Sequence, residues 1–236
     1  MSTAEGGGNI VTDGLVLCLD AANSKSIVSG STTWTDLSRS NNNGTLVNGP
    51  TFDSGNGGSI VFNGVSDYSI TQKNLGFSGD INTSISTWIY PTSVTGQIAT
   101  TSIGNSDGTL TGMGICIGIN GPGSVSVEFW TGNGMRTVSN AIQVNKWYNI
   151  IATKSIGTIN TTTSLYINGV SQSFNITSTN TPNITDYTVS IGAIKGNIVT
   201  QFYFSGKIGQ TSIYNRALSS QEVLQNYNAT KGRFGL

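Results

Sequence analysis

Short runs of apolar and β-branched residues recur from one end of the chain to the other, separated by glycine, asparagine and serine. Alternating or continuous apolar character over about four to eight residues is typical of strands. The runs predict strands at residues 15–19, 59–62, 84–90, 114–119, 124–130, 147–154, 164–167, 188–191 and 202–208. Many short strands at this spacing predict an all-β protein, and we expect a two-sheet antiparallel jelly-roll sandwich.

Asparagine-glycine pairs follow or separate several of these runs. They occur at Asn63-Gly64, Asn120-Gly121, Asn133-Gly134 and Asn168-Gly169. Both residue types tolerate the positive φ angles of tight hairpin turns. The pairs therefore predict hairpins, and hairpins connect antiparallel strands.

One segment near the C-terminus has helical spacing instead. Ser219-Ser220-Gln221-Glu222 fits a capping box and leads into apolar residues at Val223, Leu224 and Tyr227, which predicts one short helix. Residues 158–163 and 177–185 are rich in Asn and Thr and predict loops. We expect an extended N-terminal arm at 1–14, a single β domain at 15–230 and a C-terminal tail at 231–236.

Composition narrows the function. Charged residues make up 9% of the 236 residues, well below the roughly 25% of an average soluble domain. Eleven Lys and Arg balance eleven Asp and Glu without a basic run, which argues against nucleic-acid binding. Zero net charge gives no repulsion between copies, so the surface is compatible with a homo-oligomer. No apolar run approaches the roughly 18 residues of a membrane helix, and residues 1–14 lack the regions of a signal peptide.

Cys18 and Cys116 each lie inside an apolar, strand-like run. Free cysteine commonly behaves as a small buried hydrophobe, and disulfides are rare inside cells. We favour two reduced thiols. One disulfide is the alternative, and both fit the same fold.

A series of motifs, in order, resembles laminin G-like domains of the concanavalin A-like superfamily. The motifs are the segments 15–22, 34–38 and 42–46, the F-x-G-x-x-D-Y strand at 62–68, the W-hydrophobic-x-P strand at 88–91, the hairpin segments 147–152 and 165–169, and the closing segments 204–209 and 213–219. The resemblance implies that residues 15–230 form a laminin G-like jelly roll. The family's closing strand often carries an aspartate where Gln210 and Thr211 stand here, so a calcium or sugar site that depends on it is not carried over.

The end of the chain carries a second resemblance. A short helix followed by residues 231–236 is similar to the ending of structural proteins of tailed bacteriophages. This implies a virion protein, such as a capsid decoration, head fibre or tail-associated module, with the major capsid protein and other virion proteins as partners.

Catalytic residues are scarce. A glycosidase needs two carboxylates about 5 to 10 Å apart, and the E-x-D-x-x-E strand of the family's glucanases is absent. Glu222 is explained by helix capping, and Glu5 lies in the N-terminal arm. Glu128 has no acidic residue two or four positions away and is interpreted as an ordinary outward-facing strand residue. The chain contains no histidine, which excludes Ser-His and Cys-His nucleophiles. We therefore predict that it is not an enzyme.

Tryptophans and one aspartate are the candidate ligand residues. Trp88 and Trp147 lie inside apolar strands and are expected to pack between the sheets. Trp34 and Trp130 lie at strand ends beside polar loops and are candidates for stacking on sugar rings, with core or edge packing as the alternative. Asp67 matches a family position on a turn and is the candidate for calcium, the one cofactor we consider. An aspartate in a turn commonly bonds its own backbone instead.

Both ends of the chain are candidate contact segments. The glycine-rich start has too few apolar groups to fold by itself, and chain ends fray unless something holds them. We predict an intermolecular interface that contains Met1, Ser2, Thr3, Gly6, Gly7, Gly8, Asn9, Phe234 and Leu236.

Two functions remain open at this stage. The first is a non-enzymatic phage virion protein, located in the virion, that binds other virion proteins and presents its sandwich to host surface glycans. The alternative is a carbohydrate-binding or adhesion module of a bacterial surface protein.

Overall fold

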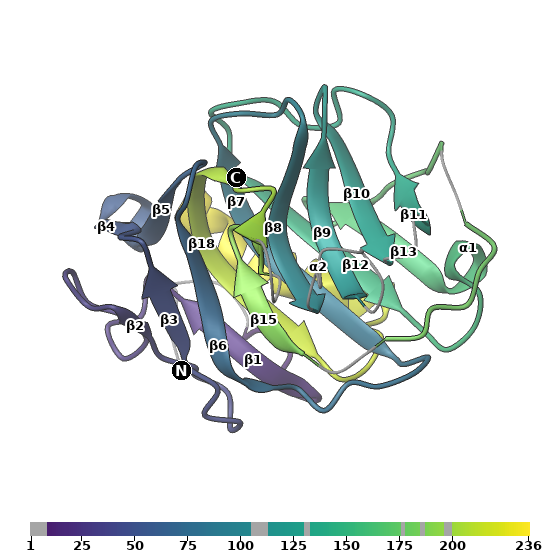
Figure 1. The fold of residues 1–236 in the computed structure, drawn as a ribbon, viewed down its shortest axis with the longest axis horizontal. Coiled ribbons are helices and arrows are strands. Elements are labelled where there is room, and N and C mark those ends of the chain that lie inside the picture. Colours follow the sequence, from purple (N-terminus) through teal and green to yellow (C-terminus); the bar gives the residue numbers. More distant parts are fainter. Residues whose placement is uncertain (1–8, 105–112, 130–132, 176–177, 185–186, 196–199) are drawn as a thin grey trace.

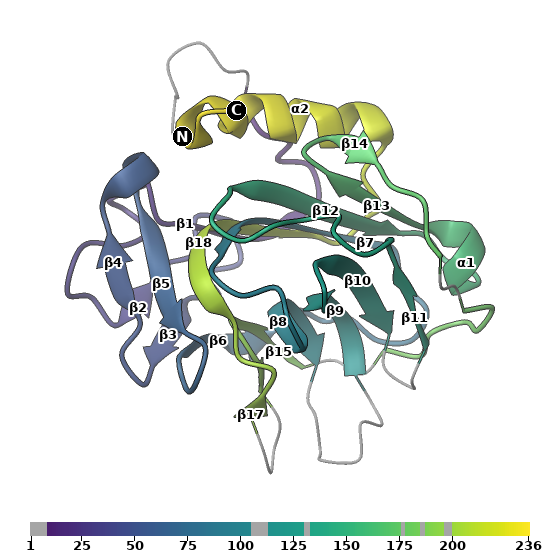
Figure 2. The same ribbon diagram turned by 90° about the horizontal axis from the view of Figure 1, so that it is seen from above.

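The computed structural model describes residues 9–104, 113–129, 133–175, 178–184, 187–195 and 200–236. Within these residues, two antiparallel sheets of eight strands each lie face to face, and a helix crosses the outer face of one of them (Figures 1 and 2). This confirms the predicted two-sheet sandwich with a short C-terminal helix. No helix in the described ranges is long and apolar enough to span a membrane.

The first sheet, sheet A, brings the two ends of the domain together. Its strands in spatial order are β14 (Val170–Ser171), β13 (Thr163–Ile167), β12 (Tyr148–Lys154), β7 (Thr83–Pro91), β18 (Ser205–Tyr214), β5 (Ser59–Asn63) and β4 (Thr51–Asp53), and β1 (Leu15–Asp20) also pairs with β18. Leu15 lies opposite Tyr214 in that pairing. The strand predicted at 202–208 begins later, at Ser205, and continues to Tyr214. It begins later because Phe202 has a φ of 60° and leaves the extended conformation.

The predicted Asn168-Gly169 hairpin joins β13 to β14 in sheet A, whereas the Asn63-Gly64 turn leads from sheet A to the other sheet and forms no hairpin. The second sheet, sheet B, contains the hairpin predicted at Asn120-Gly121. Its strands in order are β11 (Asn133–Arg136), β10 (Ser124–Phe129), β9 (Met113–Asn120), β8 (Gln97–Gly104), β15 (Thr188–Ile191), β6 (Tyr68–Asn74), β3 (Gly44–Val47) and β2 (Thr33–Trp34). Two short strands, β16 (Ile194–Lys195) and β17 (Thr200–Gln201), pair with each other. A 3₁₀ turn, η1, covers Gly55–Gly57. A four-residue helix, α1 (Ile159–Thr162), forms where a loop was predicted.

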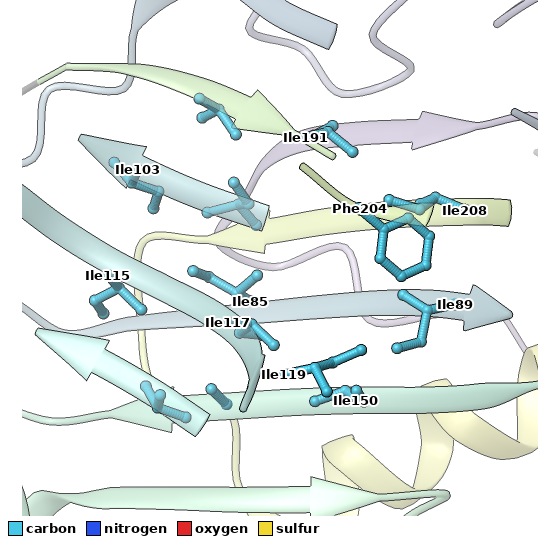
Figure 3. Packing of buried hydrophobic residues seen from close by; sticks show 14 of the residues in the cluster. Ile85, Ile89, Ile103, Ile115, Ile117, Ile119, Ile150, Ile191, Phe204 and Ile208 are labelled. Atoms are coloured by element: carbon cyan, nitrogen blue, oxygen red, sulfur yellow. The ribbon is translucent and has the colours of Figure 1, made fainter. Parts of the chain in front are cut away.

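Alternation along the strands builds the core between the sheets. Ile85, Ile89 and Ile208 of sheet A face Ile117 and Ile119 of sheet B, and all are buried (Figure 3). Burial of branched aliphatic side chains on both inner faces is the main term that holds a sandwich together. The sequence pattern located these positions because both neighbours of each core residue point the other way.

The C-terminal helix, α2 (Ser220–Thr230), lies on the outer face of sheet A (Figure 2). The predicted capping box is present, since Ser219 Oγ accepts from the Glu222 N–H at 3.3 Å and Glu222 Oε2 accepts from the Ser219 N–H at 2.9 Å. Val223 packs with Tyr214 and Leu218 in a cluster separate from the main core. The helix thus closes over an apolar strip on the outside of the sheet.

The last residues of the chain form a 3₁₀ turn, η2 (Lys231–Phe234), instead of the predicted tail. The Phe234 ring is 5% exposed and stacks on Trp88, with ring centroids 4.1 Å apart. The Trp147 ring lies 4.5 Å from the Phe234 ring. This burial leaves the Phe234 ring no surface for the predicted intermolecular contact, because its own domain already encloses it.

The same cluster corrects the placement of the two tryptophans. Trp88 and Trp147 are buried, but they lie under η2 on the outside of sheet A and not between the sheets. Trp88 alternates with Ile89, which faces the core, so the indole must point outward. Arg233 secures the turn through Asp20 Oδ1 at 2.5 Å and the Asn56 carbonyl at 2.7 Å.

The two thiols are free and buried. Cys18 lies between Leu17 and Leu19, whose side chains face the core, so its own side chain faces the outside of sheet A. By the same alternation Cys116 faces the outside of sheet B. The sandwich separates the two sulfurs, which rules out the alternative of a disulfide between them.

Candidate functional site

The sequence-predicted ligand residues do not form a common site. Trp34 is fully buried in the main core, where its ring cannot stack on a ligand. Trp130 lies outside the described residues. The Asp67 carboxylate accepts from the Asn63 backbone N–H at 3.1 Å and from Asn63 Nδ2 at 2.9 Å, so it organises the turn between β5 and β6.

Calcium gains no support from this turn. The Asp67 side chain is 5% exposed and already engaged by Asn63. Within the described ranges, no group of three or more acidic or cysteine side chains is close enough to hold a metal ion. The alternative stated above, an aspartate that bonds its own turn, accounts for Asp67.

The predicted interface residues divide into three groups. Residues 1–8, which include Met1, Ser2, Thr3, Gly6, Gly7 and Gly8, lie outside the described part of the chain. Asn9 is exposed, and its carbonyl accepts from Gln225 Nε2 of α2 at 2.8 Å. Leu236 is 48% exposed, and Phe234 is enclosed as described above. Of the described candidates, only Asn9 and Leu236 retain accessible surface.

The outer faces of the two sheets differ in what covers them. Helix α2 and η2 cover sheet A (Figure 2), whereas among the described residues the β16 segment packs on β8, β9 and β15 of sheet B. There the Lys195 N–H donates to Ser190 Oγ at 3.2 Å, and Ile194 packs on Cys116. The strands β9, β10 and β11 continue sheet B to its edge.

A group of polar side chains lies on that edge, and we call it the edge cluster: Asn120, Ser126, Glu128 and Arg136. Its position follows from alternation in β10, since Val125, Val127 and Phe129 point into the core and Ser126 and Glu128 therefore point outward. Glu128 is thus an outward-facing strand residue, as predicted from the sequence.

Hydrogen bonds connect the edge cluster internally. Arg136 Nε donates to Glu128 Oε1 at 3.1 Å, and Asn120 Nδ2 donates to Ser126 Oγ at 2.8 Å and to Glu128 Oε1 at 3.4 Å. The Arg136 side chain is 34% exposed and the Glu128 side chain 16% exposed. Among the described residues, none accepts a hydrogen bond from Arg136 Nη1 or Nη2 and none donates to Glu128 Oε2. The cluster thus presents unused donors and an unused acceptor.

Two glycines open the surface around the cluster. Gly134 lies opposite Glu128, and a Cβ there would overlap the Glu128 carboxylate. Gly118 lies opposite Ser126, and a Cβ there would lie 2.8 Å from the Ile98 carbonyl oxygen. The Asn133-Gly134 pair was predicted as a hairpin turn but lies within β11, where the missing side chain makes room for the carboxylate.

An open depression adjoins the edge cluster. Its volume is about 470 Å³, and it is lined by Thr95, Gly96, Asn120, Gly121, Pro122 and Arg136. The Asn120-Gly121 turn was predicted from the sequence, and it forms one wall between β9 and β10. None of the six lining residues is acidic or aromatic. The depression falls in the size range of small-molecule sites, although it is shallower than a closed pocket.

The electrostatics of the site are those of a neutral pair. Glu128 and Arg136 carry opposite charges at hydrogen-bond distance. Behind them, burial and the charge of Glu128 raise the pKa of the Cys116 thiol well above its usual range. The thiol therefore stays protonated and contributes neither charge nor a nucleophile to the site.

Comparison with known proteins places the fold. Residues 63–224 match the family model described as concanavalin A-like lectin/glucanases superfamily. No curated protein matches the chain. Trypanosoma rangeli sialidase in complex with sialic acid is 15% identical with a TM-score of 0.67, and the match covers 96% of this chain but only 35% of the sialidase.

Two further solved structures, both of shorter chains than the sialidase, have a similar fold. Domain 4 of AbnA, a GH43 extracellular arabinanase from Geobacillus stearothermophilus in complex with arabinotriose, is 17% identical with a TM-score of 0.64, and the match covers 90% of this chain and 98% of that domain. The binding domain of Paraclostridial Mosquitocidal Protein 1 is 21% identical with a TM-score of 0.64, at 92% and 52% coverage. At these identities the likeness concerns the fold.

Proposed function

Because the chain belongs to the concanavalin A-like lectin/glucanases superfamily, we propose that it is a non-catalytic glycan-binding module. Its binding surface in this proposal is the edge cluster together with the depression beside it. The similar domain 4 of an arabinanase was solved with arabinotriose, and the similar sialidase with sialic acid. These complexes support a sugar as the ligand class without specifying which sugar.

The observation that carries the proposal is the set of unused polar groups at the mouth of the depression. Arginine has five N–H donors in a fixed plane, and Arg136 spends only its Nε–H on Glu128 among the described residues. Glu128 holds the guanidinium plane in place, and Asn120 is tied to both Ser126 and Glu128. A preorganised group of this kind binds sugar hydroxyls without first having to order its own side chains.

The proposal is non-catalytic because of the carboxylates. Hydrolysis of a glycosidic bond generally uses two carboxyl groups, one of them able to hold a proton. Glu128 is the carboxylate of the edge cluster, and it is paired with Arg136 at 3.1 Å. We expect no turnover of arabinan, β-glucan or sialylated substrates. Turnover that Glu128→Gln abolishes would overturn this part of the proposal.

A glycan array with the purified chain, followed by calorimetric titration of the strongest ligand, tests the binding surface. Arg136→Ala should lower the affinity at least tenfold. The matched control is Arg39→Ala, because Arg39 is an exposed arginine between β2 and β3, at the opposite edge of sheet B. It should change the affinity less than twofold. Absence of any glycan ligand, or equal binding by both variants, would refute the proposal.

The virion setting predicted from the sequence remains a further proposal. Its support is the resemblance of the C-terminal helix and residues 231–236 to the ending of phage structural proteins. Mass spectrometry of purified virions tests it, since a stoichiometric component is detected there directly. Detection of the chain on a bacterial cell surface instead would favour the alternative, an adhesion module.

A further inference from the structure

We infer that the ligand of the edge cluster is an uncharged glycan, recognised through neighbouring hydroxyl groups, and that the cluster discriminates against acidic sugars. This inference rests on the proposed function and specifies its ligand class. It follows from the charges and hydrogen-bonding roles of the four residues Asn120, Ser126, Glu128 and Arg136.

Arg136 is the cation at the mouth of the depression, and Glu128 neutralises it at 3.1 Å. A carboxylate or sulfate bound to the free Nη groups of Arg136 would therefore lie within a few ångströms of the Glu128 carboxylate. Repulsion from Glu128 at about 6 Å cancels most of the attraction of Arg136 at about 4 Å. The anion also loses more hydration on binding than a hydroxyl group does, so it gains no advantage over a hydroxyl.

Ser126 is fully buried and holds Asn120 in place. Arg136 only donates and the Glu128 carboxylate only accepts, whereas Asn120 does both. Each sugar hydroxyl also does both, so two neighbouring hydroxyls can accept from Arg136 and donate to Glu128 Oε2 at the same time. An acidic group can only accept, and it would leave Oε2 without a donor. The cluster is complementary to a diol and not to an anion.

Long-range electrostatic attraction does not favour acidic ligands either. The whole chain has a formal net charge of zero, and the other five lining residues of the depression are uncharged. No excess of positive charge draws anionic ligands toward this face. Binding of an uncharged glycan should accordingly be almost independent of ionic strength.

The experiment compares glycans that share one core and differ only in an acidic sugar, such as lactose and 3′-sialyllactose, with arabinotriose as a second neutral probe. Wild-type chain is titrated with each at 50 and 500 mM NaCl. We expect a neutral probe to bind at least tenfold more tightly than the sialylated one, with less than a twofold change between the two salt concentrations. Tighter binding of the acidic member, weakened by salt, would overturn the inference.

Glu128→Gln supplies an independent test through the sign of its effect. The amide keeps the shape of the side chain and removes the charge, so neutral probes should bind about fivefold or more weakly while the sialylated probe binds no worse. A gain for the acidic glycan with an unchanged neutral affinity would sink the hydroxyl-recognition argument. If acidic glycans bind best and Arg136→Ala abolishes this, the proposed function stands and the present inference fails. If no glycan binds at all, both fail.

Discussion

Replacing Phe234 with alanine should destabilise the whole domain, although this residue is the third from the end of the chain. The ring is 5% exposed and lies 4.1 Å from the Trp88 ring and 4.5 Å from the Trp147 ring, measured between centroids. Burial of a phenylalanine contributes about 1.5–3 kcal/mol, and each aromatic pair adds about 0.5–1.5 kcal/mol. We therefore expect Phe234→Ala to cost about 3–5 kcal/mol of the free energy of unfolding, in line with other Phe→Ala changes in protein cores.

Urea unfolding followed by tryptophan fluorescence measures this directly, since Trp88 and Trp147 line the cavity that the substitution leaves. The corresponding fall in melting temperature is about 6–20 °C for a domain of this size. Leu236→Ala is the matched control, because that side chain is 48% exposed and its loss should cost under about 0.5 kcal/mol. A Phe234→Ala variant within about 1 kcal/mol of the wild type would refute the idea that the end of the chain is part of the fold.

A double-mutant cycle with Gly209 sharpens the test. A Cβ at Gly209 would lie 2.9 Å from two carbons of the Phe234 ring, closer than such atoms pack. Gly209→Ala should thus cost about 1–3 kcal/mol in the wild type. In the Phe234→Ala background that cost should largely vanish, because the added methyl group enters the empty space. Equal costs in both backgrounds would mean that the ring does not occupy the position described.

Two further predictions concern titratable groups. Hydrogen bonds from Arg216 and from the Ser219 N–H lower the pKa of Glu222 from 4.5 to about 2. The stability that this carboxylate contributes is therefore present above pH 4.5 and is lost as the pH falls toward 2. Glu222→Gln should flatten the acid-unfolding profile over that window, and an unchanged profile would contradict the capping argument. Burial raises the pKa of the Cys18 thiol to about 12 and that of the Cys116 thiol above its usual range. An aromatic disulfide reagent at pH 8 should therefore label both thiols about 100-fold more slowly in the native chain than in the unfolded chain. Rapid labelling of either thiol in the native chain would show that it is exposed.

The sequence predicted the elements that depend on local chemistry. The alternation in residues 84–90 corresponds to β7, and the capping box at Ser219 and Glu222 begins α2 as expected. Sequence periodicity could not tell which face of β7 is interior, because the sheet is covered on both sides. Trp88 was therefore assigned to the wrong side. For Trp34, in a strand of two residues, the sequence left sugar stacking and core or edge packing open, and the structure shows core packing.

The site was harder to predict, since it depends on which strands become neighbours. Glu128 was identified as outward-facing, but its partners Asn120 and Arg136 meet it only through the pairings of β10 with β9 and β11. The register that places Gly134 opposite Glu128 is set by those pairings as well. The burial of Phe234 was missed for a similar reason, because the short glycine-flanked segment is held by long-range contacts of Phe234 with the tryptophans and of Arg233 with Asp20.

The central position of β18 has a consequence for how the protein is made. β18 pairs with β1, β5 and β7, so among the described strands β1 has no partner until β18 has been synthesised. At about 5–20 residues per second, β1 waits roughly 10–40 s on the ribosome before Tyr214 can meet Leu15. A chain that stops before residue 205 lacks the strand that joins the two halves of sheet A. Translation through β18 is thus a condition of folding, and chains that terminate before it should be degraded by proteases before the edge cluster forms.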